Sequence, residues 1–194
     1  MAQYPHLVQL AWYTVDKLVV DWAKNPHYWE QEIDIQAELR SRLATAYSVL
    51  GVDEVVAIET CPDDQSRELT YRYSRAACEP SIRYKYKDRK TYRAKPDVVV
   101  WDDLPDPRKS PDRNGESWPI LWACEIKYND AEPTEWDLEK LGYLMDQNRI
   151  RYGCWLTFAM DPAIKKPSAN WDKGAHGARL WKCTARAPTR PPAT

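Results

Sequence analysis

Two short apolar runs in this chain each contain an acidic residue. Residues 97–101 read Asp-Val-Val-Val-Trp, and residues 120–126 enclose Glu125 within Ile-Leu-Trp-Ala-Cys-Glu-Ile. Both runs are rich in β-branched or aromatic side chains, which predicts buried strands. A carboxylate in such surroundings costs free energy unless a proton, a partner or a cation compensates its charge. We therefore expect the fold to bring both acids into a defined polar site.

Other periodic patterns surround these two strands. Apolar residues recur at helical spacing in three segments, residues 7–22, 29–50 and 135–147. Further strand patterns cover residues 55–58, 69–73, 83–87 and 152–160. The polar, proline-rich residues 102–118 are typical of a loop. The order helix, helix, several strands, helix, strand predicts an α/β fold with a mixed central sheet flanked by helices.

The length and cysteine content limit the organisation of the chain. With 194 residues, a single domain over residues 1–184 is expected, followed by a proline-rich, disordered tail over residues 185–194. The five cysteines show no Cys-x-x-Cys spacing, which argues against a disulfide framework or a zinc finger and favours a cytoplasmic protein. Because no signal pattern or membrane-spanning apolar run is present, we expect no membrane association.

The second acidic strand carries a lysine next to its carboxylate. Glu125 and Lys127 are two residues apart, so both side chains leave the same face of a strand. They could form a simple ion pair. With Asp97 on a neighbouring strand they could instead build a site for Mg²⁺, which prefers oxygen ligands and needs few of them from protein.

The spacing of these residues resembles a known family. Pro96-Asp97, followed 28 positions later by Glu125-Ile126-Lys127, is similar to the motif of the PD-(D/E)xK nuclease superfamily, which has the restriction-endonuclease-like fold. The resemblance covers about residues 29–160, by motif and element order rather than by extended identity. It implies a core of helix, three strands, helix and strand, preceded here by an extra N-terminal helix.

The resemblance also implies an activity. Asp97 and Glu125 would bind Mg²⁺ or Mn²⁺, and Lys127 would assist the attacking water in a metal-dependent endonuclease that hydrolyses phosphodiester bonds in DNA. A homodimer or a larger complex would allow both strands to be cut. Two alternatives stay open: a catalytically inactive nucleic-acid-binding or assembly subunit with the nuclease fold, and an RNA-cleaving member of that fold.

Many family members add a glutamate from the preceding helix, and two residues could fill this role. Glu32 lies one turn before Ile35 and shares the apolar stripe of its helix, so we favour it as a catalytic residue. Glu38 lies at the edge of that stripe and remains an alternative. On the later helix, Asp137 is expected on an exposed face, and Lys140 is left undecided.

A basic, tyrosine-rich stretch precedes the first acidic strand. Residues 67–95 contain ten lysines or arginines and three acids, although the whole chain has a net charge of -1. Basic side chains of this kind can follow a phosphate backbone. The expected nucleic-acid-binding residues are Arg72, Arg83, Lys85, Lys87 and Arg93. The alternative interpretation is a solvated sheet face.

Overall fold

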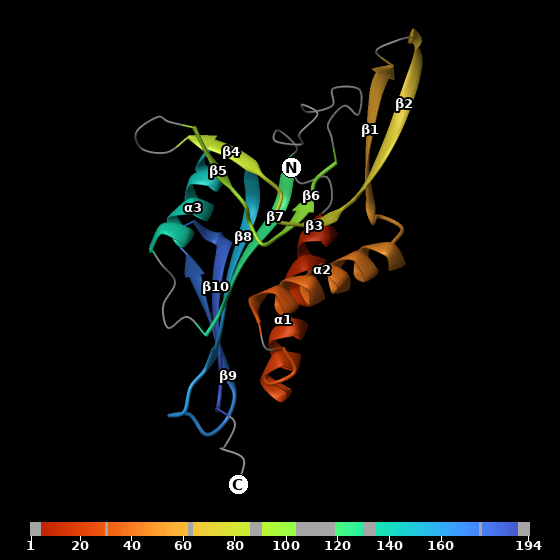
Figure 1. Cartoon of the computed structure of the whole chain (residues 1–194). Coiled ribbons are helices and arrows are strands. Elements are labelled where there is room, and N and C mark those ends of the chain that lie inside the picture. Colours follow the sequence, from red (N-terminus) through yellow and green to blue (C-terminus); the bar gives the residue numbers. More distant parts are fainter. Residues whose placement is uncertain are drawn as a thin grey trace.

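The computed structural model describes residues 5–29, 31–61, 64–85, 91–103, 119–129, 135–174 and 176–189. These residues include three helices (Figure 1): α1 (Pro5–Lys24), α2 (Glu32–Val49) and α3 (Glu135–Asp146). The first strands are β1 (Glu54–Cys61), β2 (Asp64–Ser74), β3 (Ala76–Cys78), β4 (Ile82–Lys85) and β5 (Thr91–Ala94). The remaining strands are β6 (Val98–Trp101), β7 (Ile120–Tyr128), β8 (Ile150–Met160), β9 (Ser168–Gly174) and β10 (Gly177–Ala187).

A six-stranded mixed sheet forms the centre of the molecule. Its strand order is β3-β6-β7-β8-β10-β9. The pairs β7–β8 and β8–β10 are parallel, whereas β3–β6, β6–β7 and β9–β10 are antiparallel. Helix α3 connects β7 to its parallel neighbour β8, as a parallel pair requires. The mixed α/β architecture and the N-terminal helix predicted from the sequence are confirmed.

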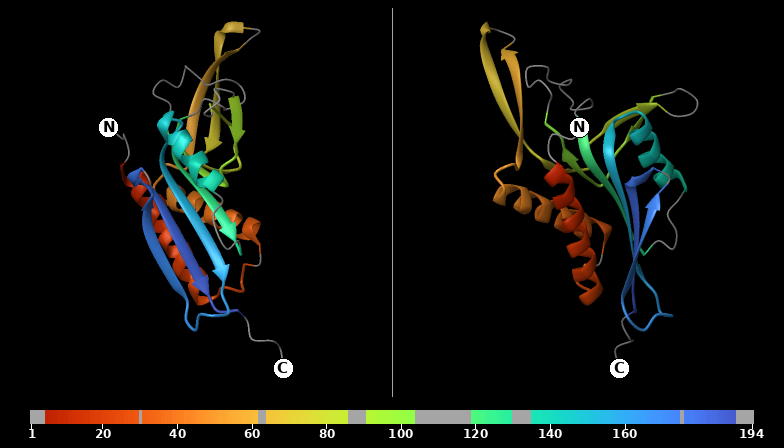
Figure 2. Two further views of the ribbon diagram at one scale, coloured as in Figure 1. Left: turned by 90° about the vertical axis from the view of Figure 1, so that its left-hand side faces the viewer. Right: turned by 180° about the vertical axis from the view of Figure 1, so that it is seen from behind.

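The helices cover the two faces of this sheet and bury two separate apolar clusters. Helices α1 and α2 lie on one face and α3 lies on the other (Figures 1 and 2). Leu39 of α2 packs in one cluster with Val98 and Ile126, and Leu144 of α3 packs in the other with Val99. Because β6 and β7 are covered on both sides, their sequences are almost continuously apolar. No helix in the described part of the chain has an apolar stretch long enough to span a membrane.

Two hairpins lie outside the central sheet. β1 pairs with β2, and β4 pairs with β5, each in a two-stranded antiparallel sheet. The β1–β2 hairpin extends away from the body of the molecule, whereas β4–β5 lies beside α3 (Figure 2). The buried Arg75 ties the base of the first hairpin to the sheet, since its guanidinium donates to Trp101 O and Glu54 O and pairs with Asp103 Oδ1 at 2.7 Å.

The C-terminal part differs from the sequence-based prediction. Residues 152–160 were expected to form the final strand, but β9 and β10 follow them. The tail was expected to begin at residue 185, yet β10 continues to Ala187, and both Ala185 and Ala187 are buried. Edge strand β9 is largely exposed and polar, so it lacks the apolar pattern that identifies a strand in sequence. The short strands β3 and β5 were also missed.

Candidate active site

The pairing of β6 with β7 brings the two predicted motifs together. Val98 lies opposite Cys124 in this antiparallel pair, so Asp97, directly before β6, reaches the Glu125 end of β7. The Asp97 Oδ2 atom accepts a hydrogen bond from the backbone N–H of Ile126. Asp97 is 7% exposed and Glu125 is 2% exposed. Both carboxylates are therefore held inside the protein, within one short stretch of adjacent strands.

Helix α2 adds two polar side chains to this region. The Gln36 Nε2 atom donates a hydrogen bond to Asp97 Oδ1 at 2.8 Å. One turn earlier, Glu32 Oε1 lies 3.5 Å from Lys127 Nζ. The Asp34 side chain accepts a hydrogen bond from the Gln31 backbone N–H at 3.1 Å, and this contact fixes the helix turn that carries Glu32. The structure thus brings Glu32 to the predicted catalytic lysine.

Helix α3 contributes a second lysine from the opposite face of the sheet. The Lys140 Nζ atom lies 2.6 Å from Glu125 Oε1, and the Lys140 side chain is only 13% exposed. Burying the Lys140 ammonium and the Glu125 carboxylate costs desolvation free energy, which their mutual attraction must offset. Lys140 was undecided from the sequence, and its contact now includes it in the site.

The surroundings of Asp97 change its acidity. Burial, together with the negative charge of Glu32, raises the pKa of Asp97 to about 6, although the Ile126 hydrogen bond and the charges of Lys127 and Lys140 act in the opposite direction. These charged groups all lie close enough to Asp97 to influence it. A buried carboxylate with a raised pKa is typical of a functional site. A bound cation would stabilise its charged form.

The two helix glutamates have different partners. Glu38 Oε1 accepts a hydrogen bond from Arg42 Nε at 2.7 Å, and Arg42 also pairs with Asp21 of α1 at 2.7 Å. Glu38 therefore helps to join α1 to α2. Glu32, in contrast, lies beside Lys127. The geometry agrees with the preference for Glu32 as the helix carboxylate of the site.

The donor set suits a hard divalent cation. Asp97, Glu125 and Glu32 offer carboxylate oxygens, and Mg²⁺ binds such oxygens while keeping several waters. The Gln36 Oε1 atom is buried and has no hydrogen-bond partner among the described residues, so the site also holds an oxygen acceptor that could face a cation or its water. Among the described residues no group of three His, Cys, Asp or Glu side chains is placed to hold a metal ion, so Asp97, Glu125 and Glu32 do not form a three-carboxylate site in this structure. A site of two carboxylates that relies on substrate phosphate is compatible with that finding.

The expected nucleic-acid-binding residues belong to two hairpins. Arg83 and Arg93 lie directly opposite each other in the β4–β5 hairpin, and both are exposed. Arg72 lies in the other hairpin, where its Nη1 atom contacts Glu54 Oε2 at 2.8 Å. Lys85 belongs to β4, but its side chain is outside the described part, and Lys87 lies outside the described residues. Binding of nucleic acid by these residues stays a prediction.

Two residues of the site were not assigned from the sequence. Gln36 interrupts the buried stripe of α2, four residues after Glu32, and a polar residue at such a position was a usable signal. Lys140 gave no signal of its own, because its contact with Glu125 depends on how α3 packs on the sheet. Asp137 lies in α3, but its side chain is outside the described part.

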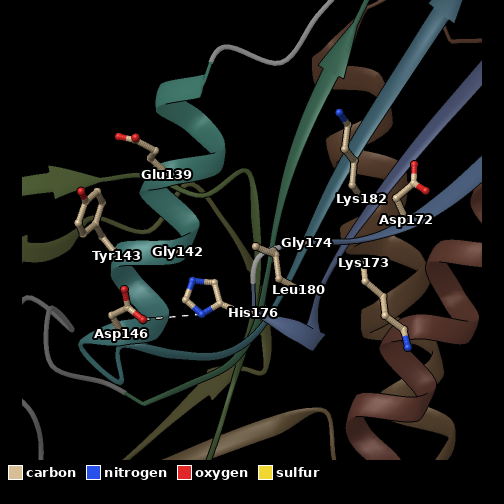
Figure 3. Close-up of a pocket in the computed structure, with 10 residues that line it drawn as sticks. All are labelled: Glu139, Gly142, Tyr143, Asp146, Asp172, Lys173, Gly174, His176, Leu180 and Lys182. Atoms are coloured by element: carbon tan, nitrogen blue, oxygen red, sulfur yellow. Dashed lines mark ion pairs between the residues drawn. The ribbon is translucent and has the colours of Figure 1, made fainter.

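A cavity of about 390 Å³ lies elsewhere, between α3 and the β9–β10 hairpin. Figure 3 shows His176 near Gly142 and in an ion pair with Asp146, at 3.7 Å between Nδ1 and Oδ1. A methyl group at Gly142 would lie 3.0 Å from His176 Nε2, so this helix glycine makes room for the imidazole. None of the predicted catalytic residues lines the cavity. We place the candidate site at Asp97 and Glu125 because polar side chains of α2 and α3 contact these two buried carboxylates.

Comparison with protein-family models, curated proteins and solved structures gave no significant match to this chain.

Proposed function

We propose that the chain is a metal-dependent endonuclease of the PD-(D/E)xK type that hydrolyses phosphodiester bonds in DNA. The observation that supports this most is the contact of Asp97 with the backbone N–H of Ile126, the residue between Glu125 and Lys127, together with the Lys127–Glu32 pair. The order of the central-sheet elements supports a restriction-endonuclease-like core, since without the two outlying hairpins α2 is followed by β3, β6, β7, α3 and β8.

Each residue of the proposed site has a defined part. Asp97 and Glu125 would hold Mg²⁺ or Mn²⁺, which supplies Lewis-acid polarisation of the phosphoryl oxygen and acidifies a water. The Lys127 ammonium would stabilise the negative charge that develops on the phosphoryl oxygens. Glu32 fixes the position of that ammonium through the 3.5 Å contact. Gln36 orients the Asp97 carboxylate through its hydrogen bond to Oδ1.

The basic hairpin supports a nucleic acid as the substrate. β5 ends at Ala94, three residues before Asp97, so the hairpin leads directly into the site. Arg83 and Arg93 are exposed cross-strand neighbours, so both guanidinium groups are accessible to a phosphate backbone. We propose that the protein cuts both strands as a homodimer or in a larger complex, since symmetric assemblies supply one site for each strand.

One contact favours a second candidate, the inactive subunit with the same fold. Lys140 holds Glu125 at 2.6 Å, and a cation bound there must share or break this pair. If the pair persists, the carboxylate is neutralised permanently and the protein binds nucleic acid without cleaving it.

A substrate panel separates these functions. Labelled single-stranded and double-stranded DNA and RNA of one sequence are incubated with the protein and Mg²⁺, with Asp97→Asn as the matched variant and a chelator as a further control. The proposal predicts that the wild-type protein with Mg²⁺ cleaves DNA, whereas Asp97→Asn and the wild-type protein with chelator do not. Cleavage restricted to RNA would indicate the RNA-cleaving alternative. Binding of DNA without any cleavage would indicate the inactive subunit.

A further inference from the structure

A second pocket lies at the other edge of the sheet, far in strand order from the candidate active site. It has a volume of about 330 Å³ and is lined by Trp12, Asp16, Trp171 and Trp181. Helix α1 supplies the first two residues, the edge strand β9 supplies Trp171, and its neighbour β10 supplies Trp181. Strand β8 separates β10 from β7 in the sheet. None of the residues of the proposed nuclease site lines this pocket.

The indole rings of this pocket are fixed by the surrounding protein. The Trp12 ring meets the buried Trp122 edge to face, with ring centroids 5.9 Å apart and an interplanar angle of 89°. The Trp181 Nε1 atom donates a hydrogen bond to Ala178 O at 3.1 Å. Trp171 packs against the core cluster formed by α1, α2 and the sheet. Aromatic surfaces held in this way lose little freedom when a ligand binds.

The charges at the pocket favour a cation. Asp16 follows Trp12 by four residues on α1, so its carboxylate lies on the same helix face as the indole. The Lys173 Nζ atom lies over the Trp181 ring, 5.6 Å from the ring centroid. The Lys173 ammonium therefore already contacts the face of the Trp181 ring. Indole faces attract ammonium groups through their negative quadrupole, and a nearby carboxylate adds to that attraction.

We propose that this pocket binds a methylated ammonium group. Methyl groups lower the cost of removing the cation from water while they fill an aromatic-lined space, and the positive charge remains for the rings and Asp16. The volume lies at the lower end of the range for small-molecule sites, which suits a group of this size. The group could belong to a small trimethylammonium compound or to a methylated lysine side chain. A nucleotide is disfavoured, because its phosphate is repelled by the negative charge of Asp16, whereas an ammonium group is attracted.

The test uses a charged ligand and its neutral counterpart. Choline and 3,3-dimethylbutan-1-ol have the same shape, but only choline is charged. Binding to the full chain is followed through the tryptophan indole N–H signals in NMR spectra and by calorimetry. The proposal predicts that choline binds at least roughly tenfold more tightly than the neutral alcohol. Equal binding of the two compounds overturns it, and so does the failure of choline and a trimethyllysine peptide to bind.

Variants assign the binding to this pocket. Asp16→Asn should weaken choline binding by roughly threefold to tenfold, and Trp181→Leu by about tenfold or more. Lys173→Met should tighten binding, because it removes the internal ammonium that competes for Trp181; a merely structural role for these residues predicts no such gain. Asp146→Asn, in the separate cavity, serves as the matched control and should bind as the wild type does. Unchanged binding in Asp16→Asn would overturn the proposal even if Trp181→Leu fails to fold.

Further arms identify the source of the group. A peptide carrying trimethyllysine is compared with the same peptide carrying unmodified lysine and with choline. Stronger binding of the methylated peptide than of choline assigns the pocket to a modified protein, and the reverse order assigns it to a small molecule. A short oligothymidylate is included as well. If it shifts the same indole signals and the ammonium compounds do not, the pocket stacks nucleobases and the proposal is wrong.

Discussion

The two hairpins outside the central sheet have the same architecture and opposite charge. Residues 54–74, which contain β1 and β2, carry five acidic residues and two arginines. Residues 82–94, which contain β4 and β5, carry six basic residues and one acid. A phosphate backbone attracts the second hairpin and repels the first. Charge alone therefore distinguishes these two segments of the chain as candidates for binding a phosphate backbone.

The hairpins also differ in how they are attached. Ile82 and Ala94 of the β4–β5 hairpin are buried in the cluster that includes residues of α3. Tyr71, Arg72 and Tyr73 of the β1–β2 hairpin are exposed, and Figure 2 shows that hairpin away from the body. A positive surface serves catalysis only if it has a fixed position relative to the reacting groups. Because Arg75 ties the β1–β2 hairpin to the sheet at its base, whereas the β4–β5 hairpin packs beside α3, we expect the β4–β5 hairpin to present the proposed substrate to Asp97.

The largest effect is expected at the site that the basic hairpin is proposed to serve. Lys127→Ala should reduce cleavage of DNA by roughly 10²- to 10⁴-fold, because it removes the charge that stabilises the transition state. Single-turnover cleavage of a labelled duplex measures the change. Glu38→Gln, which alters only the α1–α2 contact, is the control and should retain activity. If Lys127→Ala cleaves DNA as fast as the wild type, Lys127 is not a catalytic residue, and the basic hairpin does not lead to a nuclease site of the proposed kind.

Asp97 follows the basic hairpin by three residues and belongs to the candidate site. We expect its buried negative charge to reduce the stability of the metal-free protein. The pKa of the Asp97 carboxyl is about 6 in the folded protein, against 3.8 for an unperturbed aspartate, so the folded state binds the proton more tightly than the unfolded state does. Its contribution to the free energy of unfolding therefore falls as the pH rises from about 4 through about 6. Two pKa units amount to about 3 kcal/mol as an upper value.

Asp97→Asn removes this titration and can keep the hydrogen bonds, because the Gln36 amide can turn to accept from asparagine. The variant should be more stable than the wild type at pH 8, and the advantage should disappear near pH 4. Urea unfolding with a chelator present, at both pH values, measures the difference. A difference that does not depend on pH would show that the Asp97 charge has no cost.

The hairpins can be compared directly by reversing charge in each. Arg83→Glu combined with Arg93→Glu should weaken DNA binding by roughly 10- to 100-fold and reduce the salt dependence of binding by about two phosphate contacts. Arg72→Glu should have little effect, since Arg72 contacts Glu54 in the acidic hairpin. Fluorescence anisotropy over a range of salt concentrations measures both. An equal loss in the two proteins would remove the distinction between the hairpins.

The smallest effect is expected when the β1–β2 hairpin is shortened. Ile58 and Thr70 are cross-strand partners, so a two-residue Asn-Gly turn can join them after residues 59–69 are deleted. DNA binding and cleavage should change by less than about twofold, because this acidic segment is repelled by phosphate. A substantial loss of DNA affinity in the shortened protein would show that the exposed hairpin takes part in binding.

The central strands and the carboxylates could be predicted because local sequence determines them. Asp97 and Glu125 stand out in apolar runs, and Glu32 shares the apolar stripe of its helix. Gln36 was accessible by the same logic, as a polar residue in that stripe. These features need only the periodicity of a helix or a strand.

The remaining features depend on contacts between distant segments. The Lys140–Glu125 pair exists because α3 packs over β7, and no local pattern marks it. The residues from Arg67 to Lys95 read as one basic stretch, but the fold divides them between two hairpins and places the buried Arg75 in a structural role. The run of basic residues in the sequence therefore did not predict which of them share a hairpin and which are buried.

Calorimetry with Mn²⁺ tests the central claim most directly, because it detects the cation whether or not a substrate is known. We predict a single binding site in the wild-type protein, at least roughly tenfold weaker in Asp97→Asn and in Glu125→Gln and unchanged in Glu38→Gln. If the wild-type protein binds no Mn²⁺, or if all four proteins bind it equally, the carboxylates between β6 and β7 do not form a metal site.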